Sequence, residues 1–510
     1  MLVLSKSSSQ TGMVSSIFAQ WTLRSDFQRS SPKLTDDNDK LPEDVLLEIF
    51  NAYRQLYELY PDYESLWNDK DGWMKLAHVC LRWRRVVLSS STHLRLHLLF
   101  TPHRSPKASM LKFLPRLPIL VDYSSTAWTW TEEEESFALA ALRHRGGVRG
   151  ITLRSPYPTS LHKALRRSFP ELESLQICPY DSNSHELVLP ASLLSGSAPR
   201  LRRLNLEKVA PASLSPLLSF TTGLVELAIT VSTYDSSPPI PSLVRNLQRM
   251  SNLRRLKLNL LYRPDALYLS FDEVSPMAGD GLPLPKLTHL DFTVHRTYLQ
   301  ELVVGLATPS LQHLDGKLLG RAFSDFTIPH MCKFIKDTAC PFTSVRLEFS
   351  RLNIEFYASH SSSDKQFRIT IPEHASLEQL SRELSRQLSS VEELVVTSDA
   401  FRWSAEPPAQ RDFWRRFFCQ VSQMKSVQLP GEMALDISRS FQQDDQEFAP
   451  DLLPALERLE VRSLLGEGDH YATIRDGFEP LVAARKRAGH KLKFSWSLWS
   501  YTDHTQWLVR

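Results

Sequence analysis

Glycine is scarce in this chain: 17 of its 510 residues are glycine, whereas 32 are proline. Enzymes that hold phosphates or dinucleotides on glycine-rich loops usually contain more, and both the P-loop motif and G-x-G-x-x-G after a strand are missing. The hydrolase and metalloprotease patterns G-x-S-x-G and H-E-x-x-H are missing as well. The sequence therefore predicts a protein that is not an enzyme and that needs no cofactor.

Cysteine is rare too, and the five residues lie far apart in the chain: Cys80, Cys178, Cys332, Cys340 and Cys419. No two of them form a C-x-x-C pair, so neither a metal site nor a disulfide framework is predicted. Reduced thiols are typical of the cytoplasm and the nucleus, and we expect the protein in one or both.

An excess of charge and long apolar runs are also lacking. Lys and Arg number 60 against 57 Asp and Glu, a net charge of +3, so bulk charge gives no support to a nucleic-acid partner. The apolar stretch at the start of the sequence is too short for a signal peptide. No apolar run approaches the ~20 residues that span a bilayer, so we expect no membrane association.

Hydrophobic residues are plentiful, at 42%, which is enough to bury a core over most of the chain. A length of 510 residues is about three times that of a common domain, which favours several domains or an elongated repeat array. Residues 1–38 are rich in Ser, Thr and Asp without periodicity and are predicted to be a disordered tail. Ordered structure is expected to begin at Leu41.

Two helical segments and a strand are expected after the tail. In LPEDVLLEIFNAY, Pro42 suits the first position of a helix, and apolar residues recur on one face from Val45 onwards. After a polar insert, the run WMKLAHVCLRWRRVV carries two apolar stripes, which predicts one helix over 73–87 that is packed on both sides. Cys80 is expected to be packed in an apolar helix face, and Leu94, Leu96 and Leu98 to share one face of a short strand.

A helical module of about 55 residues buries too small a fraction of its surface to be stable alone. Its surplus apolar face therefore requires a contact. That contact is either a partner protein or the rest of the same chain, and periodicity does not distinguish the two.

The same residues carry a family resemblance. LPEDVLLEIF, followed by W-x-x-L-x-x-V-C-x-x-W-R-x-V-V over 73–87, resembles an F-box. The continuation, with Leu94-Arg95-Leu96, Thr101-Pro102 and the LPRLPI run at 114–119, resembles fungal F-box proteins that carry irregular leucine-rich repeats. F-box modules bind the Skp-type adaptor of SCF ubiquitin ligases. The resemblance implies that the adaptor-binding residues, on or behind the contact face, are Leu41, Pro42, Leu46, Ile49, Phe50, Val79, Cys80 and Trp83. The insert at 54–72 departs from the family pattern.

The rest of the chain is repetitive. A triad of the form apolar-x-x-apolar-x-apolar recurs, starting at Val148, Leu172, Leu201, Leu224, Leu253, Leu287, Leu311, Phe342, Val391, Met424 and Leu456. The longer form Pro-x-Leu-x-x-Leu occurs five times in this region, beginning at Pro170, Pro199, Pro285, Pro309 and Pro454, where about one chance match is expected in the whole chain. Each triad predicts a short strand with three apolar side chains directed inwards. Helices are expected over 132–142, 161–169, 299–306 and 376–388, with further strands at 367–371 and from Phe494, the last as a cap.

The predicted fold is α plus α/β: a small helical F-box at 39–100, a connector at 101–140, and a curved leucine-rich-repeat solenoid with a C-terminal cap at 141–510. The resemblance implies the substrate-recognition subunit of an SCF-type E3 ubiquitin ligase, bound through the adaptor to a cullin–RING ligase. Two alternatives remain: a non-catalytic scaffold that acts outside a ligase, and an enzyme whose site is hidden in the repeats.

Target binding is expected on the open strand surface, because the residues between the apolar positions of each triad point away from the core. The middle of the array is basic there, with Arg202, Arg203, Arg254, Arg255 and Lys257, and the next two repeats carry histidine and aspartate. These five residues are predicted to hold an acidic or phosphorylated segment of a target protein, because paired arginines suit bidentate contacts. The alternative is an ordinary solvated surface.

Overall fold

The computed structural model describes residues 41–59, 73–94, 96–101, 117–123, 131–153, 159–178, 187–231, 240–260, 282–295, 306–319, 335, 341–350, 353–360, 365–371, 374–398, 407–441, 452–464 and 471–499. The predicted tail, 1–38, lies outside these ranges, as does the helix expected at 299–306 except for its last residue, Leu306, which lies in a short strand. The chain forms two compact units, Met1–His97 and Leu98–Arg510.

The first unit is helical. It contains α2 (Glu43–Leu59), α3 (Trp73–Val79) and α4 (Leu81–Ser89). Acidic residues Glu43 and Asp44 occupy the first turn of α2, where carboxylates favour the helix dipole. Phe50 of α2 meets Trp83 of α4 edge to face, with ring centroids 4.9 Å apart. Among the side chains of these helices that the structure describes, six apolar ones are buried: Leu46, Phe50, Leu76, Ala77, Val86 and Val87.

The expectation of one continuous helix over 73–87 was wrong. Cys80 interrupts it with an extended backbone, φ −156° and ψ 171°, and its thiol accepts a hydrogen bond from the Trp83 amide at 3.4 Å. Cys80 is therefore the N-cap of α4, half-exposed, and does not pack in a helix face. Part of the insert that departs from the family pattern extends α2 to Leu59, and residues 60–72 lie outside the described ranges.

The expected strand over Leu94–Leu98 is displaced. Leu94 and Leu96 are buried but precede the strand, which is β1 (Leu98–Phe100). All three residues of β1 are buried, so alternation of exposed and buried side chains is absent here. β1 belongs to the second unit, which starts at Leu98.

The second unit is built on a sheet of sixteen strands within the described ranges, ordered β1-β2-β3-β4-β5-β6-β7-β9-β11-β14-β13-β12-β15-β16-β17-β18. The strands after β1 are β2 (Ile119–Tyr123), β3 (Val148–Leu153), β4 (Ser174–Ile177), β5 (Arg203–Glu207), β6 (Glu226–Val231), β7 (Arg255–Leu260), β9 (His289–His295), β11 (His313–Leu319), β12 (Ser344–Phe349), β13 (Ile354–Ser359), β14 (Gln366–Ile371), β15 (Glu393–Ser398), β16 (Ser426–Pro430), β17 (Arg458–Leu464) and β18 (Lys493–Trp499). A separate short pair joins β8 (Leu282–Pro283) to β10 (Leu306–Ala307).

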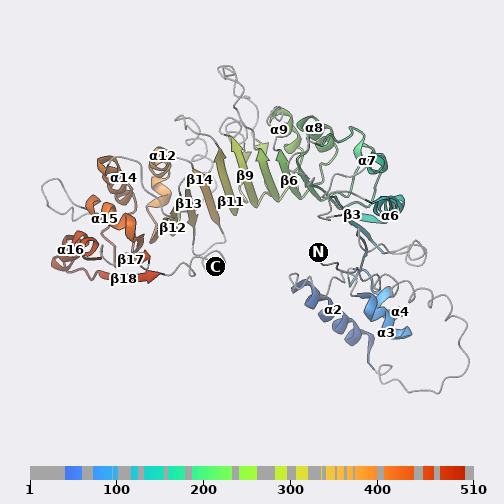
Figure 1. Ribbon diagram of the computed structural model, residues 1–510, viewed down its shortest axis with the longest axis horizontal. Coiled ribbons are helices and arrows are strands. Elements are labelled where there is room, and N and C mark those ends of the chain that lie inside the picture. Colours follow the sequence, from blue (N-terminus) through green and yellow to red (C-terminus); the bar gives the residue numbers. More distant parts are fainter. Residues whose placement is uncertain are drawn as a thin grey trace, which may run out of the picture. The chain divides into compact units, whose positions relative to one another are not determined.

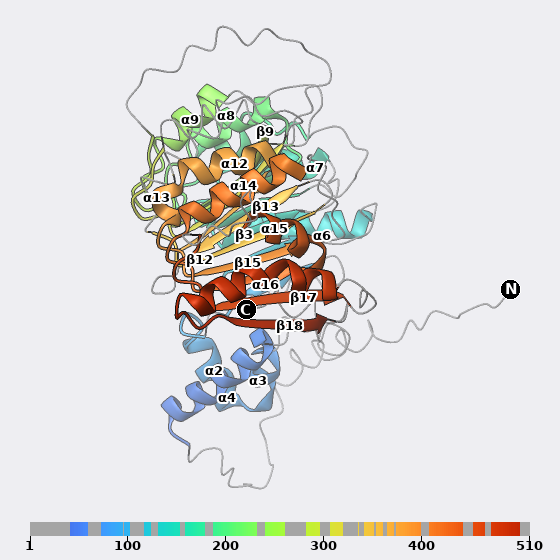
Figure 2. The same ribbon diagram turned by 90° about the vertical axis from the view of Figure 1, so that its left-hand side faces the viewer.

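Helices cover one face of this sheet, on the outer side of its curve (Figures 1 and 2). They are α6 (Glu132–Arg143), α7 (Thr159–Leu165), α8 (Pro211–Ser219), α9 (Ile240–Leu247), α12 (His374–Glu383), α13 (Ser385–Leu388), α14 (Pro407–Gln420), α15 (Gly431–Ser440) and α16 (Tyr471–Arg487), with a 3-10 turn at Leu193–Gly196. The opposite face carries no helix in the described part of the chain, and we call it the open face. The molecule is thus a mixed α/β protein with a long, mostly parallel sheet, compatible with a solenoid.

Each predicted triad leads into or lies in a strand, and the reason is visible in the backbone. In the Pro199 repeat, the Leu201 amide donates to the Ala198 carbonyl at 3.1 Å, which closes a turn with proline at its second position. The amides of Arg202 and Arg203 then both donate to the Glu173 carbonyl of the preceding repeat. The triad leucines at 201, 204 and 206 are buried under the helices. The same turn closes before Leu224 and Leu253, where no proline precedes the leucine by two residues, so proline favours this turn into the next strand but is not required for it.

One part of the sheet does not follow chain order. β12, β13 and β14 form an antiparallel meander, so β14 lies beside β11 while β12 pairs with β15. Among the described strands of the sheet, β13 alone runs against the others. The sequence predicted the strand at 367–371 and the helix at 376–388, but neither β13 nor this order.

The boundary between the units also differs from the expectation. The predicted connector, 101–140, contains β2 and most of α6, which pack into the sheet unit. α6 begins at a capping box in which Thr131 and Glu134 exchange hydrogen bonds of 2.8 and 3.2 Å. At the other end, β18 pairs with β17 over seven residues, as expected for the alternating segment from Phe494.

Candidate functional site

The helical unit exposes an apolar surface. Five large hydrophobic side chains are exposed in the described part of the chain, and four belong to this unit: Val45, Ile49, Val79 and Leu81. The fifth, Val188, lies in the sheet unit. Scattered exposed leucines and valines are normal, so the feature to explain is the concentration of four of them in so small a unit. We call these four side chains the apolar surface.

Helix α2 contributes two of them, one turn apart. Val45 and Ile49 are 39% and 41% exposed, whereas Leu46 and Phe50, the next residue in each case, are at most 1% exposed. A shift of one residue turns a side chain by about 100° around a helix, which separates an outer face from the core. Leu46 and Phe50 therefore lie in the core of the helical unit, and Ile49 lies on its exposed surface.

The junction between α3 and α4 contributes the other two. Val79, the last residue of α3, is 53% exposed, and Leu81, the first of α4, is 67% exposed. Arg82 donates a hydrogen bond to the Leu41 carbonyl just before α2, so this junction lies beside the start of α2. The break at Cys80 therefore leaves an exposed apolar side chain on each side of it, at a junction that is tied to the start of α2.

The remaining predicted residues support this arrangement. Leu41 is half-buried, and Pro42 is exposed with its carbonyl accepting the Leu46 amide at 3.2 Å. Trp83 is half-buried and meets Phe50. Val45 and Leu81 are also exposed but were not among the residues predicted to bind the adaptor. Apolar periodicity identifies a helix face, but it does not show which of two adjacent apolar residues is buried by neighbouring helices.

The sheet unit offers the second surface, the open face. Side chains there occupy aligned rows because the strands pair in register. One row runs Arg203, Glu226, Arg255, His289, His313 on β5, β6, β7, β9 and β11. The next runs Asn205, Ala228, Lys257, Asp291, Asp315 on the same strands. We call them the first and second rows.

The five basic residues predicted to bind a target lie together here, but they are not equally available. Arg255 lies 3.8 Å from Glu226, and Lys257 lies 3.0 Å from Asp291. Arg202 donates to the Gly223 carbonyl at 2.9 Å. Within the described part of the chain, the exposed side chains of Arg203 and Arg254 have no such partner. Exposed ion pairs contribute little to stability, so these charges remain available to a ligand.

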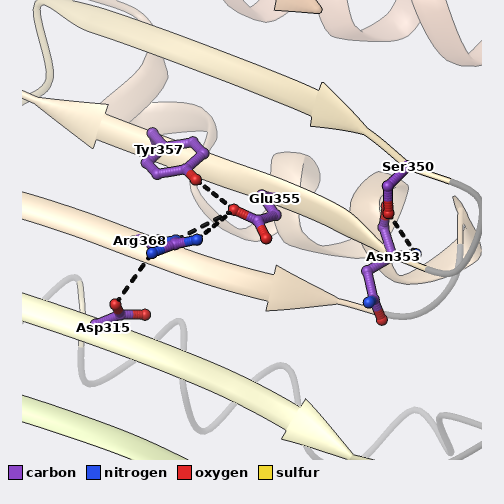
Figure 3. Close-up of polar contacts among 6 residues, drawn as sticks. All are labelled: Asp315, Ser350, Asn353, Glu355, Tyr357 and Arg368. Atoms are coloured by element: carbon purple, nitrogen blue, oxygen red, sulfur yellow. Dashed lines mark hydrogen bonds and ion pairs between the residues drawn. The ribbon is translucent and has the colours of Figure 1, made fainter. Parts of the chain in front are cut away.

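A polar network continues the second row onto the meander (Figure 3). Arg368 on β14 lies between two carboxylates, 2.7 Å from Glu355 on β13 and 3.4 Å from Asp315 on β11. Tyr357 donates to Glu355, and the Arg368 guanidinium lies 5.1 Å from the centre of the tyrosine ring. Burial, together with the bond to Glu355 and its charge, holds the pKa of Tyr357 far above its usual range, so the hydroxyl stays a donor. This network ties β11, β14 and β13 together; Figure 3 also shows the Ser350–Asn353 bond beside it, between the end of β12 and the start of β13.

Burial also raises the pKa of the Asp315 carboxyl. The neighbouring carboxylates Asp291 and Glu355 act in the same direction, and the cations Arg368 and Lys257 oppose them. In the described part of the chain, no group of three or more His, Cys, Asp or Glu side chains is placed to hold a metal ion. None of the described helices has the length and apolar character needed to cross a bilayer.

The comparisons with known proteins leave the identity of the chain open. Neither a model of a known protein family nor a curated protein matches the chain.

Proposed function

We propose that this chain is a non-catalytic, substrate-recognition subunit of an SCF-type E3 ubiquitin ligase. The helical unit, which resembles an F-box, binds a Skp-type adaptor and through it the cullin–RING ligase. The sheet unit, which resembles irregular leucine-rich repeats, binds a target protein on the open face with Arg202, Arg203, Arg254, Arg255 and Lys257. The chain then acts by proximity, because a held target has a high effective concentration near the ubiquitin-charged enzyme.

The observation that carries this proposal is the apolar surface. Four of the five exposed large hydrophobic side chains of the described residues belong to the helical unit. Full burial of a fully exposed apolar side chain of this size contributes about 1.5–3 kcal/mol, and these four, which are 39–67% exposed, would each gain part of that. An apolar partner surface would therefore gain substantially by covering Val45, Ile49, Val79 and Leu81.

The test replaces two exposed residues and leaves the core intact. Ile49→Asp with Val79→Asp should abolish capture of a purified Skp-type adaptor, because two carboxylates would be buried without partners. Val188→Asp is the matched control: Val188 is 67% exposed but lies in the sheet unit, and this variant should capture the adaptor as the parent does. Thermal unfolding followed by circular dichroism should be the same for all three proteins.

The change of Leu46 and Phe50 to Asp is a less selective test. Both side chains are buried in the helical unit, so the double variant should lose adaptor capture by unfolding that unit. Adaptor capture by the Ile49→Asp, Val79→Asp variant at the level of the parent would refute the proposal. Adaptor capture by the parent without cullin or ubiquitin conjugation would favour a scaffold outside a ligase.

A further inference from the structure

The first row of the open face is rich in cations and hydrogen-bond donors at one end of the strands. Arg203, Arg255, His289 and His313 stand in register on β5, β7, β9 and β11, with Glu226 on β6 as the one carboxylate. Arg202 and Arg254 immediately precede β5 and β7, and their exposed side chains add two charges at the same strand ends. Together these residues form a band that crosses five neighbouring strands. We call it the cationic band.

Two histidines form one end of the band. The rings of His289 and His313 are stacked, with centroids 4.3 Å apart and planes 22° apart. The Thr288 hydroxyl lies 2.9 Å from Nδ1 of His289. Both rings are half-buried, so each keeps an edge toward solvent. Two protonated rings in this arrangement would repel each other unless an anion lay beside them.

The surroundings keep His289 largely neutral at pH 7.5. Burial lowers the pKa of His289, the neighbouring His313 and Arg255 lower it further, and Glu226 opposes them. Gln366 on β14 adds an uncharged neighbour to His313. The nearest charges on the second row are two ion pairs, Lys257–Asp291 at 3.0 Å and Arg368–Asp315 at 3.4 Å.

We propose that the cationic band, including the His289–His313 stack, is a proton-linked site for an extended acidic or phosphorylated segment of the target protein. This inference rests on the proposed function, because it assigns chemistry to the target surface. An anion beside the stack favours the charged imidazolium form, and by linkage a proton on the stack favours the anion. Binding therefore takes up protons, and affinity rises as the pH falls from 8 towards 5.5.

The geometry also sets the spacing of the acidic groups. From β5 to β11 the band crosses four inter-strand steps, which is about 19 Å, or about six residues of extended chain. One anionic group of the bound segment would lie near Arg203 and Arg254, and a second would lie near the His289–His313 stack. The two groups would be about 12 Å apart. The segment should therefore carry acidic residues three or four positions apart. A uniform polyanion such as nucleic acid fits less well, because Asp291 and Asp315 line the adjacent row.

The experiment uses the full chain without the adaptor. A displayed library of random 12-residue peptides is selected at pH 6.0, and enriched peptides are then measured by fluorescence polarisation at constant ionic strength from pH 5.5 to 8. We expect enrichment of peptides with two Glu or Asp three or four positions apart. Their affinity should rise about fivefold or more over this range, since a proton bound at a shifted site can contribute up to tenfold per pH unit. Glu peptides are measured first, because phosphate itself titrates near pH 6.

Variants separate the two parts of the band. His289→Asn with His313→Asn should flatten the pH dependence and preserve the affinity at pH 8, whereas His144→Asn, at the exposed end of α6, should change neither. Arg203→Gln with Arg254→Gln should weaken binding about tenfold or more at every pH. Lys486→Gln with Arg487→Gln, exposed on α16, is the matched control and should bind as the parent does.

Synthetic peptides with phosphoserine in place of the glutamates then distinguish a phosphorylated segment from a merely acidic one; tighter binding of either form identifies the natural group. A library without acidic enrichment would overturn the inference, as would a pH dependence that survives the histidine changes, or tighter binding of a random 12-nucleotide single strand than of the selected peptides. None of these results bears on adaptor capture, which is measured separately through Ile49 and Val79.

Discussion

Gly316 shows how a single residue resolves an irregularity of the repeat pattern. It stands in β11 at a position where the other triads have a large apolar side chain. The space is filled from the neighbouring strand, because a Cβ on Gly316 would lie 2.6 Å from Cζ of Phe292. Phe292 is buried and aligned with Gly316 in the β9–β11 ladder. The aromatic ring on one strand therefore requires the missing side chain on the next.

Gly316→Ala should lower the free energy of unfolding by about 1–3 kcal/mol, because the added methyl overpacks a filled core. Chemical denaturation measures the change. Gly146→Ala is the control, since a Cβ at Gly146 would meet nothing within 4 Å. In a Phe292→Leu background, Gly316→Ala should cost less free energy of unfolding than in the parent, because the smaller side chain leaves room for the added methyl. An equal cost in both backgrounds would contradict the proposed contact.

Individual residues also mark the limit of sequence patterns. The helix over residues 43–53 was predictable from its start signal and its apolar period. The sequence did not predict that Ile49 is exposed and Leu46 is buried, because both lie within one broad apolar face. Contacts with α3 and α4 decided it, and those depend on the break at Cys80.

At the scale of elements, the meander β12–β13–β14 is the main departure from a regular array. After β11 the chain skips two strand positions to form β12, and it then returns through β13 to place β14 beside β11. Arg368 connects β14 to both neighbours through Glu355 and Asp315. Because Glu355 accepts from Arg368 and Tyr357 together, removal of the guanidinium leaves a half-buried carboxylate with two N–H donors fewer.

Arg368→Met should therefore loosen the meander. We expect a loss of about 1–3 kcal/mol, typical for hydrogen bonds to charged groups, and faster amide exchange in β13 and β14. Hydrogen exchange read by mass spectrometry locates the effect. Arg382→Met, which removes an exposed ion pair with Glu378 on α12, should change little. Unchanged exchange in β13 would show that strand pairing alone holds the meander.

At the scale of the whole molecule, we expect each of the two compact units to bind a different partner. The hydrogen-bonded sheet begins at Leu98, whose amide donates to the Pro118 carbonyl at 2.8 Å. The exposed apolar surface belongs to the helical unit, and the cationic band belongs to the sheet unit. Binding of an adaptor and binding of a target are thus expected to be separable.

Removal of residues 1–97 should leave the thermal transition of the sheet unit within a few degrees of the parent, and it should abolish adaptor capture. Circular dichroism and pull-down measure the two effects. Removal of residues 1–130, which also deletes β1 and β2, is the comparison and should lower the transition, because it exposes the apolar edge of β3. A lower transition already on removal of residues 1–97 would show that the sheet depends on the helical unit.

The sequence alone determined much of the array. Each of the eleven triads leads into or lies in a strand, and in five of them a proline two residues before the leucine occupies the turn that precedes the strand. Turn chemistry and side-chain alternation are local properties, so they can be read from neighbouring residues. The basic middle of the open face, and the histidine and aspartate strands after it, follow from the same alternation.

Only the tertiary structure decided which residues meet across strands. The order of β12, β13 and β14, the stacking of His289 on His313 and the ion pairs of Arg255 and Lys257 depend on pairing between segments far apart in the chain. The outer position of Ile49 and Val79 likewise depends on how three helices pack. Such contacts arise from long-range pairing and burial, which leave no periodic signal in any one segment.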